Sequence, residues 1–256
     1  MRAARRKAGL AERRAAGERG AEAARCAFRG LMLYAVGDIH GRIDKLDALL
    51  RVLPLASGDR LVFLGDYVDR GPASKEVLDR LIDVADAYPC VFLLGNHESM
   101  FLDFLGWSGP AYFGADVFLP NGGDATLASY GWLEPRMPSP GELALPAKHE
   151  AFFRSLQLHH AEGAYVFVHA GLGRTLARAG DVAWALRHAR VEELLWDRAS
   201  SDWEHDLGAT VIYGHTPRPD FQVRWNLPYS IGIDTGAVYG GPLTAIRLPD
   251  ETLFQV

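Results

Sequence analysis

Five short polar blocks, each following a run of apolar residues, constrain this chain more than any other feature. The blocks are GDIHG (37–41), GDYVDRG (65–71), GNHE (95–98), HAG (169–171) and GHT (214–216). The runs at 31–36, 60–64 and 90–94 have the length and apolar character of buried strands. Because ligands in open α/β sheets bind at the carboxyl ends of strands, we expect the blocks to converge although they span most of the chain.

The segments between the first three blocks have helical periodicity. Leu46, Leu49 and Leu53 share one face of the segment after the first block, and residues 73–88 repeat that spacing. The second half of the chain is richer in predicted strands. Strands that alternate with helices predict parallel pairing and a layered α/β core.

Length and charge favour a single catalytic domain at residues 31–256, preceded by a basic arm. The 256 residues are 48% hydrophobic, enough for one large core. Residues 1–30 carry nine Lys or Arg and three Glu, net +6, so the remainder carries −11 of the total −5. We expect this arm to be disordered or a frayed helix, with Met32 as an alternative start. Residues 106–145, rich in Gly and Pro, are predicted to form a lid-like insertion in which only 124–130 is helical.

Composition also excludes several classes of protein. No uncharged apolar stretch reaches the roughly 18 residues of a membrane span. Cys26 and Cys90 are far apart, which argues against a disulfide framework and favours a reducing, cytoplasmic location. Nothing after residue 30 is basic enough for a nucleic-acid partner, and we expect a monomer.

The polar blocks supply a mixed nitrogen and oxygen ligand set. The candidate metal ligands are Asp38, His40, Asp66, Asn96, His169 and His215. The set has no thiolate, which suits first-row divalent ions such as Mn²⁺, Fe²⁺ or Zn²⁺ rather than a structural zinc. Six ligands are too many for one catalytic ion with open positions, so two ions that share Asp66 fit better. A turn or a helix cap would explain any one block, but not all five.

In this order the five blocks resemble the metallophosphoesterase superfamily, and most closely the PPP-type serine/threonine protein phosphatases in their compact bacterial and phage form. The resemblance covers about residues 33–248. It implies a layered β-sandwich core flanked by helices, with a dinuclear metal site at the carboxyl ends of the strands. Mn²⁺ is the favoured ion, with Fe or Zn as alternatives. The implied ligands are Asp38 and His40 for one ion, Asp66 as the bridge, and Asn96, His169 and His215 for the other.

The same resemblance implies the catalytic roles. His97 would be the general acid, held by Asp69, and Arg70 would bind the substrate phosphate. Arg198 is a second phosphate-binding candidate on a weaker signal, the segment LLWDR at 194–198. A hydroxide that bridges the ions would attack phosphorus, and His97 would protonate the leaving alkoxide.

The main functional prediction is therefore a phosphomonoester hydrolase, a serine/threonine protein phosphatase acting on a phosphoprotein or phosphopeptide. The alternative is a dinucleoside tetraphosphate hydrolase or another phosphodiesterase on the same fold. The segments VDRG and GNHE favour monoester hydrolysis, because a nucleotide leaving group depends less on an acid. A non-enzymatic scaffold fits poorly, because every expected ligand and the acid are present.

Overall fold

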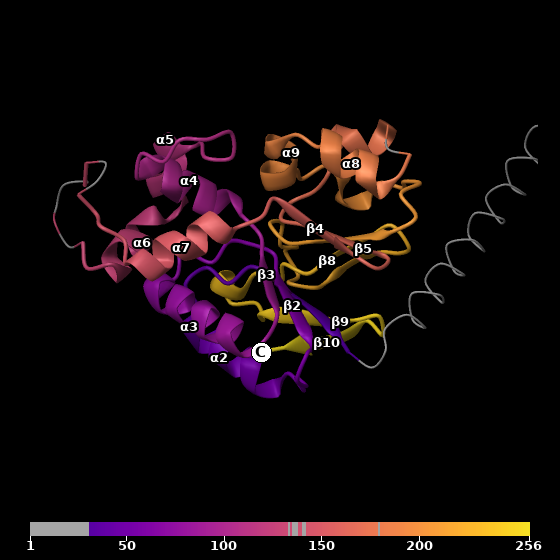
Figure 1. Cartoon of the computed structure of the whole chain (residues 1–256), viewed down its shortest axis with the longest axis horizontal. Coiled ribbons are helices and arrows are strands. Elements are labelled where there is room, and N and C mark those ends of the chain that lie inside the picture. The colour runs from indigo at the N-terminus through magenta and orange to yellow at the C-terminus, as the bar shows by residue number, and fades with distance from the viewer. Residues whose placement is uncertain (1–30, 133, 135–137, 140–141, 179) are drawn as a thin grey trace, which may run out of the picture.

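The computed structural model describes residues 31–256, except 133, 135–137, 140–141 and 179 (Figure 1). The basic arm at residues 1–30 lies outside the described residues, so its form stays a prediction. No helix within the described part of the chain is long and apolar enough to cross a membrane.

The first of two five-stranded sheets carries the three strands that the sequence predicts near its start. Its order is β10-β9-β1-β2-β3. The strands are β1 (Leu33–Val36), β2 (Arg60–Phe63), β3 (Cys90–Phe92), β9 (Thr244–Leu248) and β10 (Thr252–Gln255). The first three pair in parallel, as expected from the helices between them, whereas β9 and β10 add antiparallel.

The second sheet is also mixed and has the order β4-β5-β6-β8-β7. The strands are β4 (His159–Glu162), β5 (Tyr165–Val168), β6 (Thr210–Tyr213), β7 (Arg224–Asn226) and β8 (Ser230–Gly232). Its three central strands pair in parallel, and β4 and β7 pair antiparallel at the two edges. Parallel central strands place several carboxyl ends at the same end of the sheet.

Alternating side chains show how the layers stack. Along β1, Leu33 and Ala35 belong to the core shared with the second sheet, whereas Tyr34 belongs to the core under the helices. Along β6, Ile212 faces the first sheet and Val211 faces the outer helices. The central strands of each sheet are therefore buried on both faces, which explains why β1, β5 and β6 appear as continuous apolar runs.

Helices cover the two outer faces of the sandwich (Figure 1). On the first sheet lie α2 (Ile43–Val52), α3 (Ser74–Ala87), α4 (Asn96–Phe104) and α7 (Ala147–Ser155). On the second lie α8 (Val182–His188), α9 (Val191–Trp196) and the 3₁₀ turn η2 (Gly173–Arg178). A two-sheet core with helices on both sides confirms the predicted fold class.

The segment predicted as an insertion contains more helix than the sequence indicated. It holds α5 (Ala115–Phe118), η1 (Leu119–Asn121) and α6 (Gly123–Ser129). The expectation that only 124–130 is helical is wrong because a four-residue helix has no detectable period. Contact with the core stabilises it: the ring of Phe118 is fully buried and lies 4.8 Å from that of Phe104. The lid-like role of this segment stays a prediction.

Candidate active site

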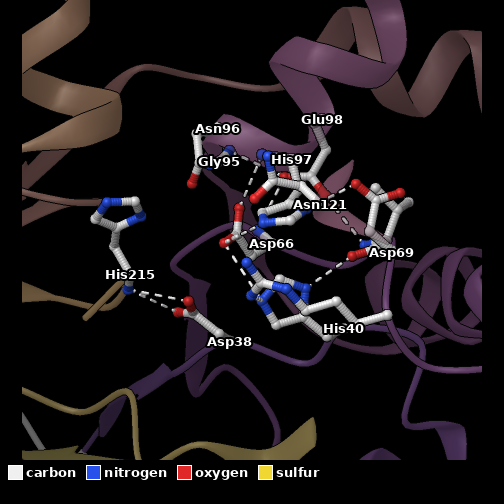
Figure 2. A network of polar contacts seen from close by, with 12 residues as sticks. Asp38, His40, Asp66, Asp69, Gly95, Asn96, His97, Glu98, Asn121 and His215 are labelled. Atoms are coloured by element: carbon white, nitrogen blue, oxygen red, sulfur yellow. Dashed lines mark hydrogen bonds and ion pairs between the residues drawn. The ribbon is translucent and has the colours of Figure 1, made fainter. Parts of the chain in front are cut away.

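The strand ends bring residues of the five polar blocks together around Asp66, and Figure 2 labels members of every block except HAG. Asp66 follows β2, and its carboxylate lies 3.5 Å from His40 Nε2 and 3.3 Å from His169 Nε2. His97, at the start of α4, has its Nε2 4.0 Å from the same carboxylate. All four side chains are buried. Residues from β1, β2, β3 and β5 thus meet at one carboxylate, as the strand-end placement predicts.

Two groups of side chains that could hold a metal ion share Asp66. One group is His40, Asp66 and His97, and the other is Asp66, His169 and His215, with the ligand atoms of each group within 4.8 Å of one another. A carboxylate with one oxygen available to each group is what a bridging ligand requires. His97 stands in the first group, where the sequence led us to expect Asp38.

Asp38 and Asn96 lie beside the second group. Both carboxylate oxygens of Asp38 accept the backbone N–H of His215, at 3.1 and 2.9 Å (Figure 2). The side-chain oxygen of Asn96 lies 3.0 Å from His169 Nε2. All six candidate ligands therefore sit in one cluster, although their assignment to particular ions stays a prediction.

The hydrogen bonds of two imidazoles show that this cluster fits cations. His40 Nδ1 donates to the carbonyl of Val68 and His169 Nδ1 to that of Leu64, each at 2.8 Å. Nε2 of each ring is therefore an acceptor, and that of His169 lies 3.3 Å from the Asp66 carboxylate and 3.0 Å from the side-chain oxygen of Asn96, where acceptors repel each other. A divalent ion between them would remove that repulsion, and such outer hydrogen bonds orient metal-ligating histidines in general.

The protonation states are those that metal ligands need. Burial lowers the pKa of His40 and His169, and that of His215 to about 2, so all three rings are neutral at pH 7. Burial alone would raise the pKa of Asp66, but the surrounding imidazoles, foremost His169, hold it below its usual range. Burial, with neighbouring Asp234, raises the pKa of Asp38. A bound cation would relieve that repulsion between carboxylates.

The second half of the GDYVDRG block builds a separate pair. Asp69 is fully buried, and one of its oxygens lies 2.7 Å from His97 Nδ1. Its other oxygen accepts the hydroxyl of Thr126 at 2.7 Å, and its backbone N–H is bound by Thr126 and Ser74. This network fixes the ring of His97 with Nε2 facing the Asp66 carboxylate.

Two arginines reach the two ligand groups from different segments. Arg70 Nη1 donates to His40 Nε2 at 2.6 Å, within the first group. Arg198 Nη1 donates to the carbonyl of His215 at 3.4 Å, beside the second group. Each guanidinium thus supplies positive charge next to one candidate ion position.

The backbone of the site is strained. Seven non-glycine residues within the described ranges have a left-handed φ, and five of them belong to this site. The five are His40, Asp66, Asp69, Arg70 and His215, with φ between 46° and 70°. This conformation costs about 1–3 kcal/mol per residue and persists where function demands it.

The polar cluster matches a known family. The model of the calcineurin-like phosphoesterases matches residues 31–219, more than half of the chain. The chain belongs to the calcineurin-like phosphoesterases. Its metal-ligand geometry and two-sheet fold agree with that membership, and the superfamily resemblance seen in the sequence is confirmed.

Three relatives of this phosphoesterase carry bis(5'-nucleosyl)-tetraphosphatase names. It is 27% identical to bis(5'-nucleosyl)-tetraphosphatase PrpE [asymmetrical] of Anoxybacillus flavithermus, over 88% of this chain and 94% of that protein. The protein of the same name from Geobacillus thermodenitrificans is 29% identical, with 86% and 92% covered. The symmetrical bis(5'-nucleosyl)-tetraphosphatase of Aromatoleum aromaticum is 27% identical, with 88% and 97% covered.

Solved structures share the fold of this phosphoesterase. A candidate diadenosine tetraphosphatase has a TM-score of 0.63 at 22% identity, covering 90% of this chain and 94% of that one. A protein serine/threonine phosphatase from Saccharomyces cerevisiae has a TM-score of 0.56 at 16% identity, covering 94% and 87%. The fold alone therefore does not distinguish the two activities.

No role was predicted from the sequence for two buried carboxylates of the phosphoesterase site, Glu98 and Asp234. Glu98 accepts the backbone N–H of Gly95, Asp66 and Tyr67 at 2.7–3.0 Å, and burial raises its pKa to about 8. Asp234 accepts the N–H of Gly236 at 3.0 Å, and burial raises its pKa to about 6. The available signal for Glu98 was its position three residues after Gly95, which is typical of a capping box.

Glycines beside the ligands let the backbone approach them, and Gly214 provides a test. A Cβ at Gly214 would overlap Oδ1 of Asp38, whereas a Cβ at Gly180 would meet nothing within 4 Å. We expect Gly214→Ala to weaken metal binding about 10- to 100-fold, because it displaces a ligand carboxylate. Metal affinity would be measured by titration of chelator-treated protein, with Gly180→Ala as the matched control. Equal affinity in both variants would contradict a ligand role for Asp38.

Proposed function

We propose that this phosphoesterase hydrolyses dinucleoside tetraphosphates. The observation that carries the proposal is the agreement in name among relatives that match 86–88% of this chain and 92–97% of their own lengths. The main prediction from the sequence, a serine/threonine protein phosphatase, is not confirmed. The alternative considered there has the better support.

Two divalent ions would be held by the six ligands Asp38, His40, Asp66, Asn96, His169 and His215, with Mn²⁺ favoured. When bound, such ions activate water and neutralise charge on phosphate oxygens. The histidine nitrogens favour Mn²⁺, Fe²⁺ or Zn²⁺ over Mg²⁺, which prefers oxygen ligands and water. Cytoplasmic location and a monomeric state stay predictions.

The arginines support a substrate with several phosphates. Arg70 and Arg198 adjoin different ligand groups, so a phosphate chain that crosses both groups would contact both guanidinium groups. The ligand carboxylates neutralise half of the charge of two divalent ions, and the arginines add two further positive charges. The centre is therefore strongly positive inside a domain of net charge −11, which favours a polyanion there.

His97 and Asp69 would handle the proton in this reaction. The Nδ1–H of His97 donates to Asp69, so a proton for the leaving group would be carried on Nε2. Asp69 is kept in place by Thr126 and stabilises the charged imidazolium.

A comparison of substrates tests the proposal. Metal-loaded protein should hydrolyse diadenosine tetraphosphate with a kcat/KM at least about 100-fold above that for a phosphoserine peptide. The phosphate chain of the dinucleotide can contact both arginines, whereas a single phosphate cannot. Chromatography of the products should show AMP and ATP, as for an asymmetrical cleavage. A higher kcat/KM for the peptide would contradict the proposal and support a protein phosphatase instead. ADP as the sole product would show that the cleavage is symmetrical.

A further inference from the structure

An open cleft adjoins the phosphate-binding side of the site. Its volume is about 440 Å³, and Arg70 forms one of its walls. The other lining residues are Pro120, Asn121, Gly122, Val238 and Tyr239. Because Arg70 also donates to His40 Nε2, this one residue connects the cleft with the first ligand group.

Tyr239 contributes a partly exposed aromatic ring to this cleft. Its side chain is 53% exposed, and the guanidinium of Arg70 lies 5.4 Å from the ring centre. The 3₁₀ turn Ala237–Tyr239 that carries the ring is held by the start of α2 and the residue before it: Arg42 donates to the carbonyl of Ala237 at 3.0 Å, and Lys45 to that of Gly241 at 2.9 Å. An exposed ring on an anchored loop loses little conformational freedom when it binds a ligand.

Asn121, another lining residue of the cleft, offers an oriented polar group. The side-chain N–H of Asn121 donates to the carbonyl of Val117 at 2.8 Å, which orients the amide. Its side-chain oxygen accepts no hydrogen bond from the residues that the structure describes. An aromatic ligand with an amino group would meet an acceptor here, in a cleft that the apolar residues Pro120 and Val238 also line.

We propose that the cleft binds a nucleobase of the substrate, with adenine stacked on Tyr239 and its amino group donating to Asn121. The cleft offers what a nucleotide needs: an aromatic ring on which the base can stack, an acceptor for its amino group, and an arginine for its phosphate. The inference rests on the proposed function, because it assigns one end of a dinucleoside tetraphosphate to this cleft.

The decisive measurement is binding of AMP and of ribose 5-phosphate, which lacks the base, to the metal-loaded protein by calorimetry. AMP should bind about 10-fold more tightly, since stacking on an aromatic side chain contributes about that factor or more. Tyr239→Ala should reduce AMP affinity to that of ribose 5-phosphate, whereas Tyr239→Phe should keep most of the preference. Equal binding of AMP and ribose 5-phosphate by the wild-type protein would overturn the proposal.

Turnover separates this inference from the proposed function. Tyr239→Ala should raise the KM for diadenosine tetraphosphate about 10-fold. Trp225→Ala removes a ring of similar exposure, 44%, on the edge strand β7 and should leave both measurements unchanged. Hydrolysis of diadenosine tetraphosphate with an unaltered KM in Tyr239→Ala would refute the base site alone. A wild-type protein that prefers AMP to ribose 5-phosphate but does not hydrolyse the dinucleotide would refute the proposed function and support the base site.

Discussion

Asp66→Asn is expected to lower kcat/KM by at least about 10³-fold on every substrate and to reduce the bound metal below two ions per chain. The carboxylate of Asp66 is shared by both ligand groups, so its loss weakens both positions at once. Divalent ions supply several kcal/mol of charge stabilisation in such sites, which sets the size of the effect. Elemental analysis and steady-state kinetics would measure the two quantities.

The variant should still fold. Asp66 has a φ of 53°, and Asn is one of the few residues that tolerate this left-handed backbone. A second buried carboxylate provides the control: Asp59 is 1% exposed and accepts the backbone N–H groups of Met32 and Ala56 at 2.8 Å, away from the ligand groups. Asp59→Asn should lower the melting temperature yet keep both metals. Full metal content and full activity in Asp66→Asn would exclude the shared-ligand arrangement.

The convergence of the candidate ligands could be predicted from local patterns in the sequence. Asp38, Asp66 and His169 each come directly after an apolar run, and the carboxyl ends of neighbouring parallel strands must lie together. The alternation of Leu33 and Tyr34 between two cores could not be foreseen in the same way. A strand buried on both faces has no polar positions, so the number of layers is not visible in its sequence.

Contacts made by the segment 106–145 could not be predicted from the sequence, for a different reason. Thr126 binds Asp69 across 57 positions of the chain, and α6 has to be placed by its packing before this pair exists. The left-handed backbone of Asp69 and Arg70 has the same origin. Such strain is imposed by the surrounding fold and is not a preference of these residue types.

Substrate class was the least predictable property. The roles predicted for the metal ligands and for the pair His97–Asp69 would serve the hydrolysis of either kind of substrate, so these blocks do not settle the choice between a phosphoprotein and a dinucleotide. The residues that would make this choice are isolated ones, Tyr239 and Asn121, which converge only in the folded chain. An exposed Tyr in a loop has no pattern that separates it from ordinary surface residues.

His97→Asn is expected to cost about 10²–10⁴ in kcat when the leaving group needs a proton, and clearly less when it does not. Phenyl phosphate and p-nitrophenyl phosphate provide the matched pair, because they differ little in size while p-nitrophenolate leaves as a stable anion. The proton would come from His97 Nε2, since Nδ1 is bound to Asp69 at 2.7 Å. The measurement is kcat on both esters, together with metal content, which distinguishes a lost acid from a lost ligand.

Asp69→Asn and Thr126→Val extend the same test outward from the ring. Asp69→Asn removes the charge that stabilises the imidazolium and should show the same dependence on leaving group with a smaller loss. Thr126→Val removes only the hydroxyl bound to Asp69, so its loss should be smaller again but larger on phenyl phosphate than on p-nitrophenyl phosphate. Ser129→Ala, which removes a hydroxyl of α6 bound to the carbonyl of Thr126, is the control and should not alter the ratio of the two rates.

An equal loss on both esters in His97→Asn, accompanied by loss of metal, would make His97 a ligand of the first group, as its distance of 4.0 Å from Asp66 would allow. An equal loss with both metals retained would leave it a role in phosphate binding, and Asp69 and Thr126 would then position that contact and not an acid.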